Sequence, residues 1–245
     1  MAPAYRGLAY VVLEDLILEA WGNRMPQLSF EVTSAAQDGS GVCRDVKAVA
    51  LIPGTGEYSL ATTPVHQDLG LGELRSMNVN TPMGGTDFTV SMNILGRELP
   101  NVGSVSVVVS WFGSDLRIGQ CTVQPKVEQR EIDGDELPWR VAGIGRNAAE
   151  PVARVNDRPI YGGTPADQAV IEGLRAIAAS GRKAVFYPFI LMEQLAGNGL
   201  ADPYGAQEQP VMPWRGRVTT SRAPGQPGSV DGTAAAQAEV EAFFG

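Results

Sequence analysis

Two stretches in the second half of the chain are almost continuously apolar. Residues 104–112 are dominated by valine, and residues 183–192 form a second such run. Runs of this kind are typical of strands buried on both faces. Between them, apolar residues recur at helical spacing over 170–178, while Thr164-Pro165 predicts the start of a helix and Gly181 its end. Strand, helix and strand in this order predict a βαβ unit with parallel strands.

The same kind of pattern predicts further elements on both sides of this unit. Residues 47–52 are typical of a short strand, and residues 88–99 carry one helical stripe that follows Thr86 as its N-cap. Residues 233–244 predict a final helix, and Gly245 stands where a C-terminal cap is expected. Since such a helix ordinarily leads into another parallel strand, we expect the chain to be part of a larger structure or to be completed by partner chains.

The rest of the chain is less regular. Two segments rich in β-forming residues, 5–18 and 27–33, predict strands near the N-terminus. The segments without a clear period are 54–85, 113–163 and 194–231. Turn residues within the second of them predict a hairpin with arms at 120–127 and 139–144.

Composition narrows the class of protein. The chain has 245 residues, of which 44% are hydrophobic, and this excludes a disordered tail. Nineteen Lys and Arg against 27 Asp and Glu give a formal net charge of −8, which argues against binding to nucleic acid or to anionic membranes. The longest apolar run is far too short to cross a bilayer. Two cysteines and one histidine exclude a disulfide framework, a multi-histidine zinc site and most Ser-His-Asp triads, so we expect no metal and no cofactor.

Long stretches of the sequence are similar to one family. Near the N-terminus these are AYRGLAYVV at 4–12 and GNRMPQLSFEV at 22–32, followed by LIPGTGEY at 51–58 and ATTPVH at 61–66. Later stretches are VVVSWFGSDLR at 107–117, CTVQPKVE at 121–128, YGGTP at 161–165, FYPFILM at 186–192 and PWRGR at 213–217. Together they resemble the tail-tip hub proteins of long-tailed phages, above all the large tail-tip protein of gene transfer agents, called the megatron or host-specificity protein.

The resemblance implies an α+β or α/β chain in two parts. Residues 1–46 are expected to be strands of a hub β-domain and a linker. Residues 47–245 are expected to be the first part of a glycoside-hydrolase-like TIM barrel with long insertions, incomplete in this chain. The resemblance also implies a homotrimer bound to other distal-tail and hub proteins of the baseplate. The expected location is the tail tip of a phage-like virion, made in the bacterial cytoplasm.

Barrel enzymes of this kind need two carboxyl groups at the carboxyl ends of their strands. Asp115 follows the first predicted long strand and Glu193 follows the second, so both are weak candidates for catalysis. In retaining barrel glycosidases, however, the acid and the nucleophile usually lie on later strands, which this chain lacks. We therefore expect no catalysis by this chain alone. Aromatic platforms for a saccharide are the other candidate site, at Trp111, Trp139 and Trp214.

The leading expectation for function is therefore structural. The chain is expected to belong to the baseplate hub that attaches to and penetrates the host envelope and through which DNA is ejected, where an acidic lumen would let DNA slide. One alternative is a cell-wall glycoside hydrolase. Another is a saccharide-binding module of the tail tip, acting on a cell-envelope saccharide without hydrolysis.

Overall fold

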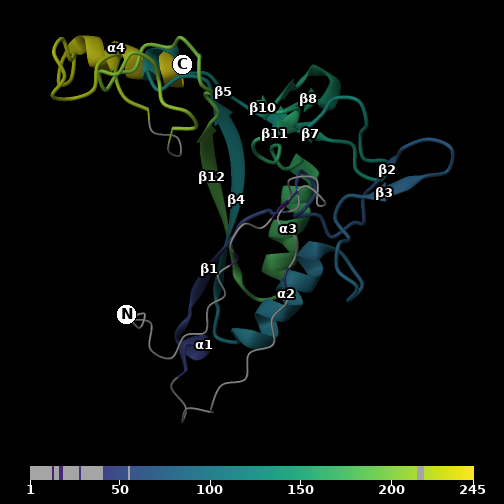
Figure 1. The fold of residues 1–245 in the computed structure, drawn as a ribbon. Helices are drawn as coiled ribbons and strands as arrows, with labels where there is room; N and C mark the ends of the chain where they lie inside the picture. Colours follow the sequence, from purple (N-terminus) through teal and green to yellow (C-terminus); the bar gives the residue numbers. More distant parts are fainter. Residues whose placement is uncertain (1–12, 14–16, 19–27, 29–40, 55, 214–217) are drawn as a thin grey trace.

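The computed structural model describes residues 13, 17–18, 28, 41–54, 56–213 and 218–245 (Figure 1). The strands predicted at 5–18 and 27–33 lie, apart from isolated positions, outside the described residues. Among the described residues the chain is a mixed α and β protein with one four-stranded sheet, four two-stranded sheets and four α-helices. This agrees with the α+β class expected from the sequence.

Three of the four strands of the main sheet lie in segments that the sequence predicts as strands. They are β1 (Ala48–Leu51), β4 (Ser104–Gly113) and β12 (Lys183–Met192), in the order β1-β4-β12 and all parallel. Ser104 pairs with Ala48 on one side and with Lys183 on the other, so the three strands start at the same level. The predicted βαβ unit is thus confirmed, and a second one precedes it.

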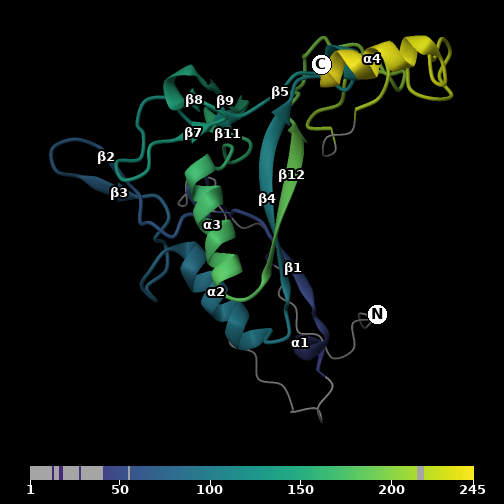
Figure 2. The ribbon, with the colours of Figure 1, turned by 180° about the vertical axis from the view of Figure 1, so that it is seen from behind.

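Two helices cover one face of this sheet (Figure 2). They are α2 (Asp87–Glu98) and α3 (Asp167–Ala179), and their apolar residues share a core with Val105, Val107 and Val109 of β4. The Thr86 side chain accepts a hydrogen bond from the Thr89 N–H, so the predicted N-cap of α2 is confirmed.

The start of α3 predicted at Thr164-Pro165 is wrong by two residues, because Thr164 belongs to a different network. The Thr164 backbone N–H donates to the Lys126 carbonyl at 2.7 Å, and its hydroxyl accepts from the Lys126 N–H at 3.1 Å. The helix therefore begins at Asp167, with Ala166 in the capping position. Asp167 places a negative charge in the first turn, where it interacts favourably with the helix dipole.

The hairpin predicted between 120–127 and 139–144 is also wrong. The first arm divides into β5 (Val123–Gln124), which pairs with the end of β4, and β6 (Lys126–Val127), which pairs with β9 (Glu150–Pro151). The second arm closes on itself, because Ala142 and Gly143 adopt positive φ and turn β7 (Arg140–Val141) back onto β8 (Ile144–Gly145). The segment between β4 and α3, called the insertion below, also contains two 3-10 helices and a second hairpin. These are η2 (Ile118–Gln120), η3 (Arg146–Ala148), β10 (Arg154–Val155) and β11 (Arg158–Pro159).

Segment 54–85, which shows no period, contains a hairpin of β2 (His66–Asp68) and β3 (Leu74–Ser76). Each strand has only three residues, too few for an alternation to be recognised. A one-turn helix, α1 (Val42–Asp45), precedes β1.

The predicted final helix is present as α4 (Ala234–Phe244), with Thr233 before it and Gly245 after it. It lies at the carboxyl end of the sheet, beside η2 (Figure 1). There Phe243 packs against the small cluster of Leu116, Cys121 and Met192. None of the described helices is long and apolar enough to cross a membrane.

Candidate functional site

Asp115 lies just beyond β4, as predicted, but it is fully engaged in hydrogen bonds. Its two oxygens accept from the Arg117 guanidinium at 3.0 and 2.6 Å, and Oδ1 also accepts from the Gln209 amide at 2.7 Å. Burial alone would raise the pKa of this carboxyl, but the hydrogen bonds from Arg117 and Gln209 outweigh it and lower the pKa. Asp115 is therefore a charged structural group and a poor proton donor.

Glu193 lies just beyond β12 and is engaged in a similar way. Its Oε1 forms an ion pair with Lys126, and its Oε2 accepts from the Ala153 N–H at 2.8 Å. The side chain is only 11% exposed. Both carboxyls that the sequence indicated thus reach the expected end of the sheet, where they hold the insertion and the following loop in place.

The three tryptophans have different surroundings. Trp139 is completely buried, and its indole N–H donates to the Thr164 carbonyl at 2.8 Å, so neither face of the ring is exposed to a saccharide. Trp111 is half-buried against the main core. Trp214 lies outside the described residues.

A buried network of charged and polar side chains was not indicated by the sequence. Arg146 is its centre: it forms ion pairs with Glu57 and with Asp133, the latter at 2.9 Å, and donates to the Tyr58 hydroxyl at 2.8 Å. The Tyr58 hydroxyl donates in turn to Asp133 at 2.7 Å. The other oxygen of Glu57 accepts from the Glu128 N–H at 2.7 Å. All the principal polar atoms of the network are thus paired.

Burial dominates the electrostatics of this network. It raises the pKa of Glu57 to about 7, against the opposing charge of Arg146, and the neighbouring Glu128 carboxylate adds to the rise. Burial also raises the pKa of Tyr58, whereas the hydrogen bonds received by Asp133 outweigh its burial and lower its pKa. Glu57 is therefore a buried carboxyl that can exchange a proton near neutral pH.

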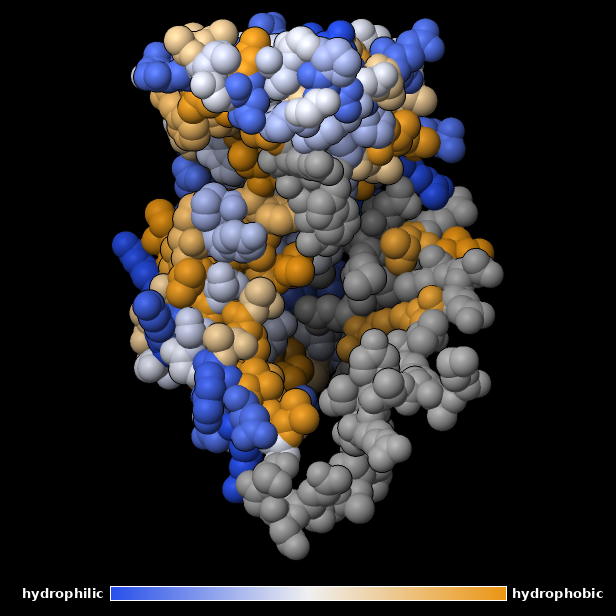
Figure 3. Space-filling view, turned by 90° about the vertical axis from the view of Figure 1, so that its left-hand side faces the viewer, coloured by the Kyte–Doolittle hydropathy of each residue, from blue (hydrophilic) through white to orange (hydrophobic). Residues whose placement is uncertain are grey.

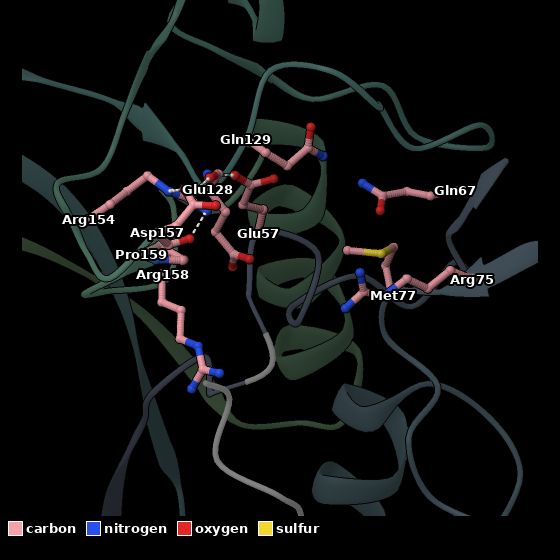
Figure 4. A pocket seen from close by; sticks show the side chains of 10 residues that line it. All are labelled: Glu57, Gln67, Arg75, Met77, Glu128, Gln129, Arg154, Asp157, Arg158 and Pro159. Atoms are coloured by element: carbon pink, nitrogen blue, oxygen red, sulfur yellow. Dashed lines mark hydrogen bonds and ion pairs between the residues drawn. The ribbon is translucent and has the colours of Figure 1, made fainter. Parts of the chain in front are cut away.

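Glu57 lines a polar pocket of about 260 Å³ (Figure 4). Gln67, Arg75 and Met77 of the β2–β3 hairpin approach from one side, and residues 154–159 of β10, β11 and their turn approach from the other. The full lining is Glu57, Gln67, Arg75, Met77, Glu128, Gln129, Arg154, Asp157, Arg158 and Pro159. A concave polar site with a shifted carboxyl is the arrangement typical of ligand binding or proton transfer.

The sequence carries only a faint signal for this site. Glu57 is followed by Tyr58, Leu60 and Ala61, and a charge beside such side chains is a candidate for burial. Its partner Arg146 is 89 positions away, between Gly145 and Asn147, with no local pattern that marks it. Gly163 is required nearby because a Cβ there would overlap the Glu57 carboxylate.

Stability is expected to depend on pH through Glu57. The folded chain keeps the proton up to about pH 7, whereas the unfolded chain loses it near 4.5, so the raised pKa stabilises the fold below pH 4.5. That contribution is lost as the pH rises to about 7. In urea unfolding, the wild type should lose stability relative to Glu57→Gln across this window. A difference between the two proteins that stays constant over the window would contradict the raised pKa.

Among the residues that the structure describes, no group of three or more His, Cys, Asp or Glu side chains is placed to hold a metal ion. No family model matches the chain, and no curated protein is found to match it.

Proposed function

We propose that the chain is a structural subunit of the tail tip of a phage-like particle, in or beside the baseplate hub. The sequence segments that resemble tail-tip hub proteins support this proposal, and one structural observation carries it. The strands β1, β4 and β12 are parallel, and their order across the sheet follows their order along the chain. The helices α2 and α3 both cover the same face of this sheet. A barrel of alternating strands and helices begins in this way, and the resemblance implies such a barrel from residue 47 onward.

The opposite face of the sheet supports the same proposal. It contributes Val108, Ser110, Tyr187 and Phe189 to an uncharged hollow of about 530 Å³. Figure 3 looks onto this side of the molecule, where hydrophobic residues gather beneath the lobe that carries α4. The interior of a barrel is filled by apolar side chains of this kind. Tyr187 is still 48% exposed, which suits a face that other strands cover in the assembled hub.

A structural role is preferred to catalysis because Asp115 and Glu193 are held in ion pairs. In the proposed assembly the chain is a trimer in contact with other hub and distal-tail proteins. It is located at the tail tip that attaches to and penetrates the host envelope, and it takes part in DNA ejection. Residues 1–46 supply the hub strands of this proposal.

The second candidate function is recognition or hydrolysis of an envelope saccharide, and the polar pocket favours it. Glu57 and Glu128 both line this pocket, and a carboxyl with a pKa of about 7 is suited to general acid catalysis at neutral pH. The carboxyl pair of this candidate therefore differs from the pair that the sequence indicated.

One experiment on intact particles tests both functions. An antibody against the chain should label the tail tip in electron micrographs, and its absence from the particles, or labelling of the capsid, would overturn the structural proposal. The same particles are assayed for release of labelled peptidoglycan. Release that Glu57→Gln abolishes would support the second candidate, whereas tip labelling without any release leaves the structural role alone.

A further inference from the structure

The β2–β3 hairpin projects away from the body of the molecule (Figures 1 and 2). Leucines stand at its end, in the turn and at the first residue of β3. We call Leu69, Leu71 and Leu74 the leucine tip; they are 41%, 111% and 62% exposed. Three exposed leucines within six residues form an apolar cluster that a soluble surface does not ordinarily keep.

The leucine tip belongs to a well-defined turn. The Leu69 N–H donates to the Glu73 carbonyl at 2.9 Å, and the Glu73 N–H donates to the Gly70 carbonyl at 3.0 Å. The Asp68 carboxylate closes the turn by accepting from the Gly70 N–H at 2.7 Å. The leucines are therefore presented by a preformed structure.

Leu71 departs from local preference in two ways at once. Its φ is +54°, between Gly70 and Gly72 at +88° and +81°, a conformation that favours glycine or asparagine. It is also the most exposed of the large hydrophobic residues that the structure describes. A residue that is unfavourable both for the backbone and for solvation indicates a function at that position.

The shape of the tip indicates what covers it. A protein interface needs a continuous surface of roughly 800 Å² on each partner. The leucines stand instead at the end of a narrow projection. The residues next to them, Asp68, Glu73 and Arg75, are charged and exposed. A lipid bilayer needs no matching pocket, and a projecting apolar apex reaches the boundary of headgroups and acyl chains, about 5–10 Å deep. Strands of three residues provide a projection of about this length.

We propose that the leucine tip inserts into the outer layer of a lipid bilayer, with Leu71 as its deepest residue. The charges beside it determine the lipid class. Two carboxylates, Asp68 and Glu73, against one guanidinium, Arg75, leave the end of the hairpin slightly acidic, in keeping with the net charge of −8. The tip should therefore bind zwitterionic lipid better than anionic lipid. This inference goes beyond the tail-tip proposal and does not depend on it.

Flotation of the full chain with vesicles tests the inference. The wild type should float with phosphatidylcholine vesicles, and less so with a mixture of phosphatidylcholine and phosphatidylglycerol. Leu71→Asn should lower the partition coefficient by roughly tenfold or more, since a buried leucine is lost. The variant should remain folded and at least as stable as the wild type, because asparagine tolerates positive φ.

Val155→Asn is the matched control. Val155 is 47% exposed beside the turn of the β10–β11 hairpin, so its replacement also removes an exposed apolar side chain and should leave flotation unchanged. Failure of the wild type to float, or equal flotation of Leu71→Asn and the wild type, would overturn the inference. Loss of self-association in Leu71→Asn, seen by light scattering without any vesicle binding, would overturn it in favour of a protein partner.

Discussion

Replacement of Arg146 by methionine is expected to lower the free energy of unfolding by about 3–5 kcal/mol at neutral pH. The guanidinium is 2% exposed and forms ion pairs with Glu57 and Asp133. Methionine fills part of the space but leaves the Asp133 carboxylate without its counter-charge and the Tyr58 hydroxyl and Glu57 carboxyl without a donor. Removal of one partner of a buried pair is more costly than replacement of both. Urea unfolding at pH 7 measures the loss.

The size of this loss should itself depend on pH. Arg146 helps to hold the pKa of Asp133 below its ordinary value, so part of the loss is present only where that carboxyl is ionised. The effect of Arg146→Met should therefore shrink as the pH falls through the ordinary range of an aspartate. Arg140→Met is the matched control, because Arg140 is exposed in the same insertion and should change stability by less than about 0.5 kcal/mol. Equal unfolding midpoints for Arg146→Met and the wild type would show that the network is not a buried ion-pair cluster.

The Arg146 network also explains how the insertion is attached to the sheet. Residues 114–166 contain strands of only two residues, which give little stability by themselves. Two ion pairs attach this insertion to residues outside it, Lys126 to Glu193 and Arg146 to Glu57. Within the insertion, the Trp139 indole donates a hydrogen bond to the Thr164 carbonyl. These contacts place Glu128 and Arg154 opposite the β2–β3 hairpin and so create the polar pocket.

The parts of the fold that the sequence predicts are those whose pattern is long and local. The valine run of β4, the apolar run of β12 and the helical stripes of α2 and α3 each extend over nine residues or more. Their periodicity alone reveals them. The order strand, helix, strand then predicts parallel pairing, because a short loop cannot return the chain to a parallel register.

The candidate site is not predictable in this way because its contacts join distant segments. Tyr58 and Asp133 are 75 positions apart, and Leu116 and Gln209 are 93 apart. A carboxylate placed after a strand, such as Asp115, is found from sequence, but whether it is free depends on partners such as Gln209 that only the folded chain supplies. The sequence therefore predicted that Asp115 and Glu193 lie at the carboxyl end of the sheet, but it did not predict that Glu57 is the carboxyl with a raised pKa.

Replacement of Trp139 by alanine is expected to cost about 3–5 kcal/mol of unfolding free energy. The side chain is fully buried, so alanine leaves a cavity, and the Thr164 carbonyl loses its hydrogen bond. The Arg146 guanidinium also loses the aromatic ring whose centroid lies 5.9 Å away. Since Thr164 lies just before α3, the loss should loosen the attachment of the insertion as well as the core.

Trp139→Phe separates the hydrogen bond from the packing. Phenylalanine keeps most of the buried ring but cannot donate to the Thr164 carbonyl, so we expect a smaller loss of about 1–3 kcal/mol. Both values come from urea unfolding. A role in saccharide binding makes a different prediction: Trp139→Phe would then weaken saccharide binding and leave stability unchanged. Unfolding of Trp139→Ala at the same urea concentration as the wild type would contradict the buried position. Stability that increases from alanine to phenylalanine to the wild type would show that both the packing of the ring and its hydrogen bond to Thr164 stabilise the fold.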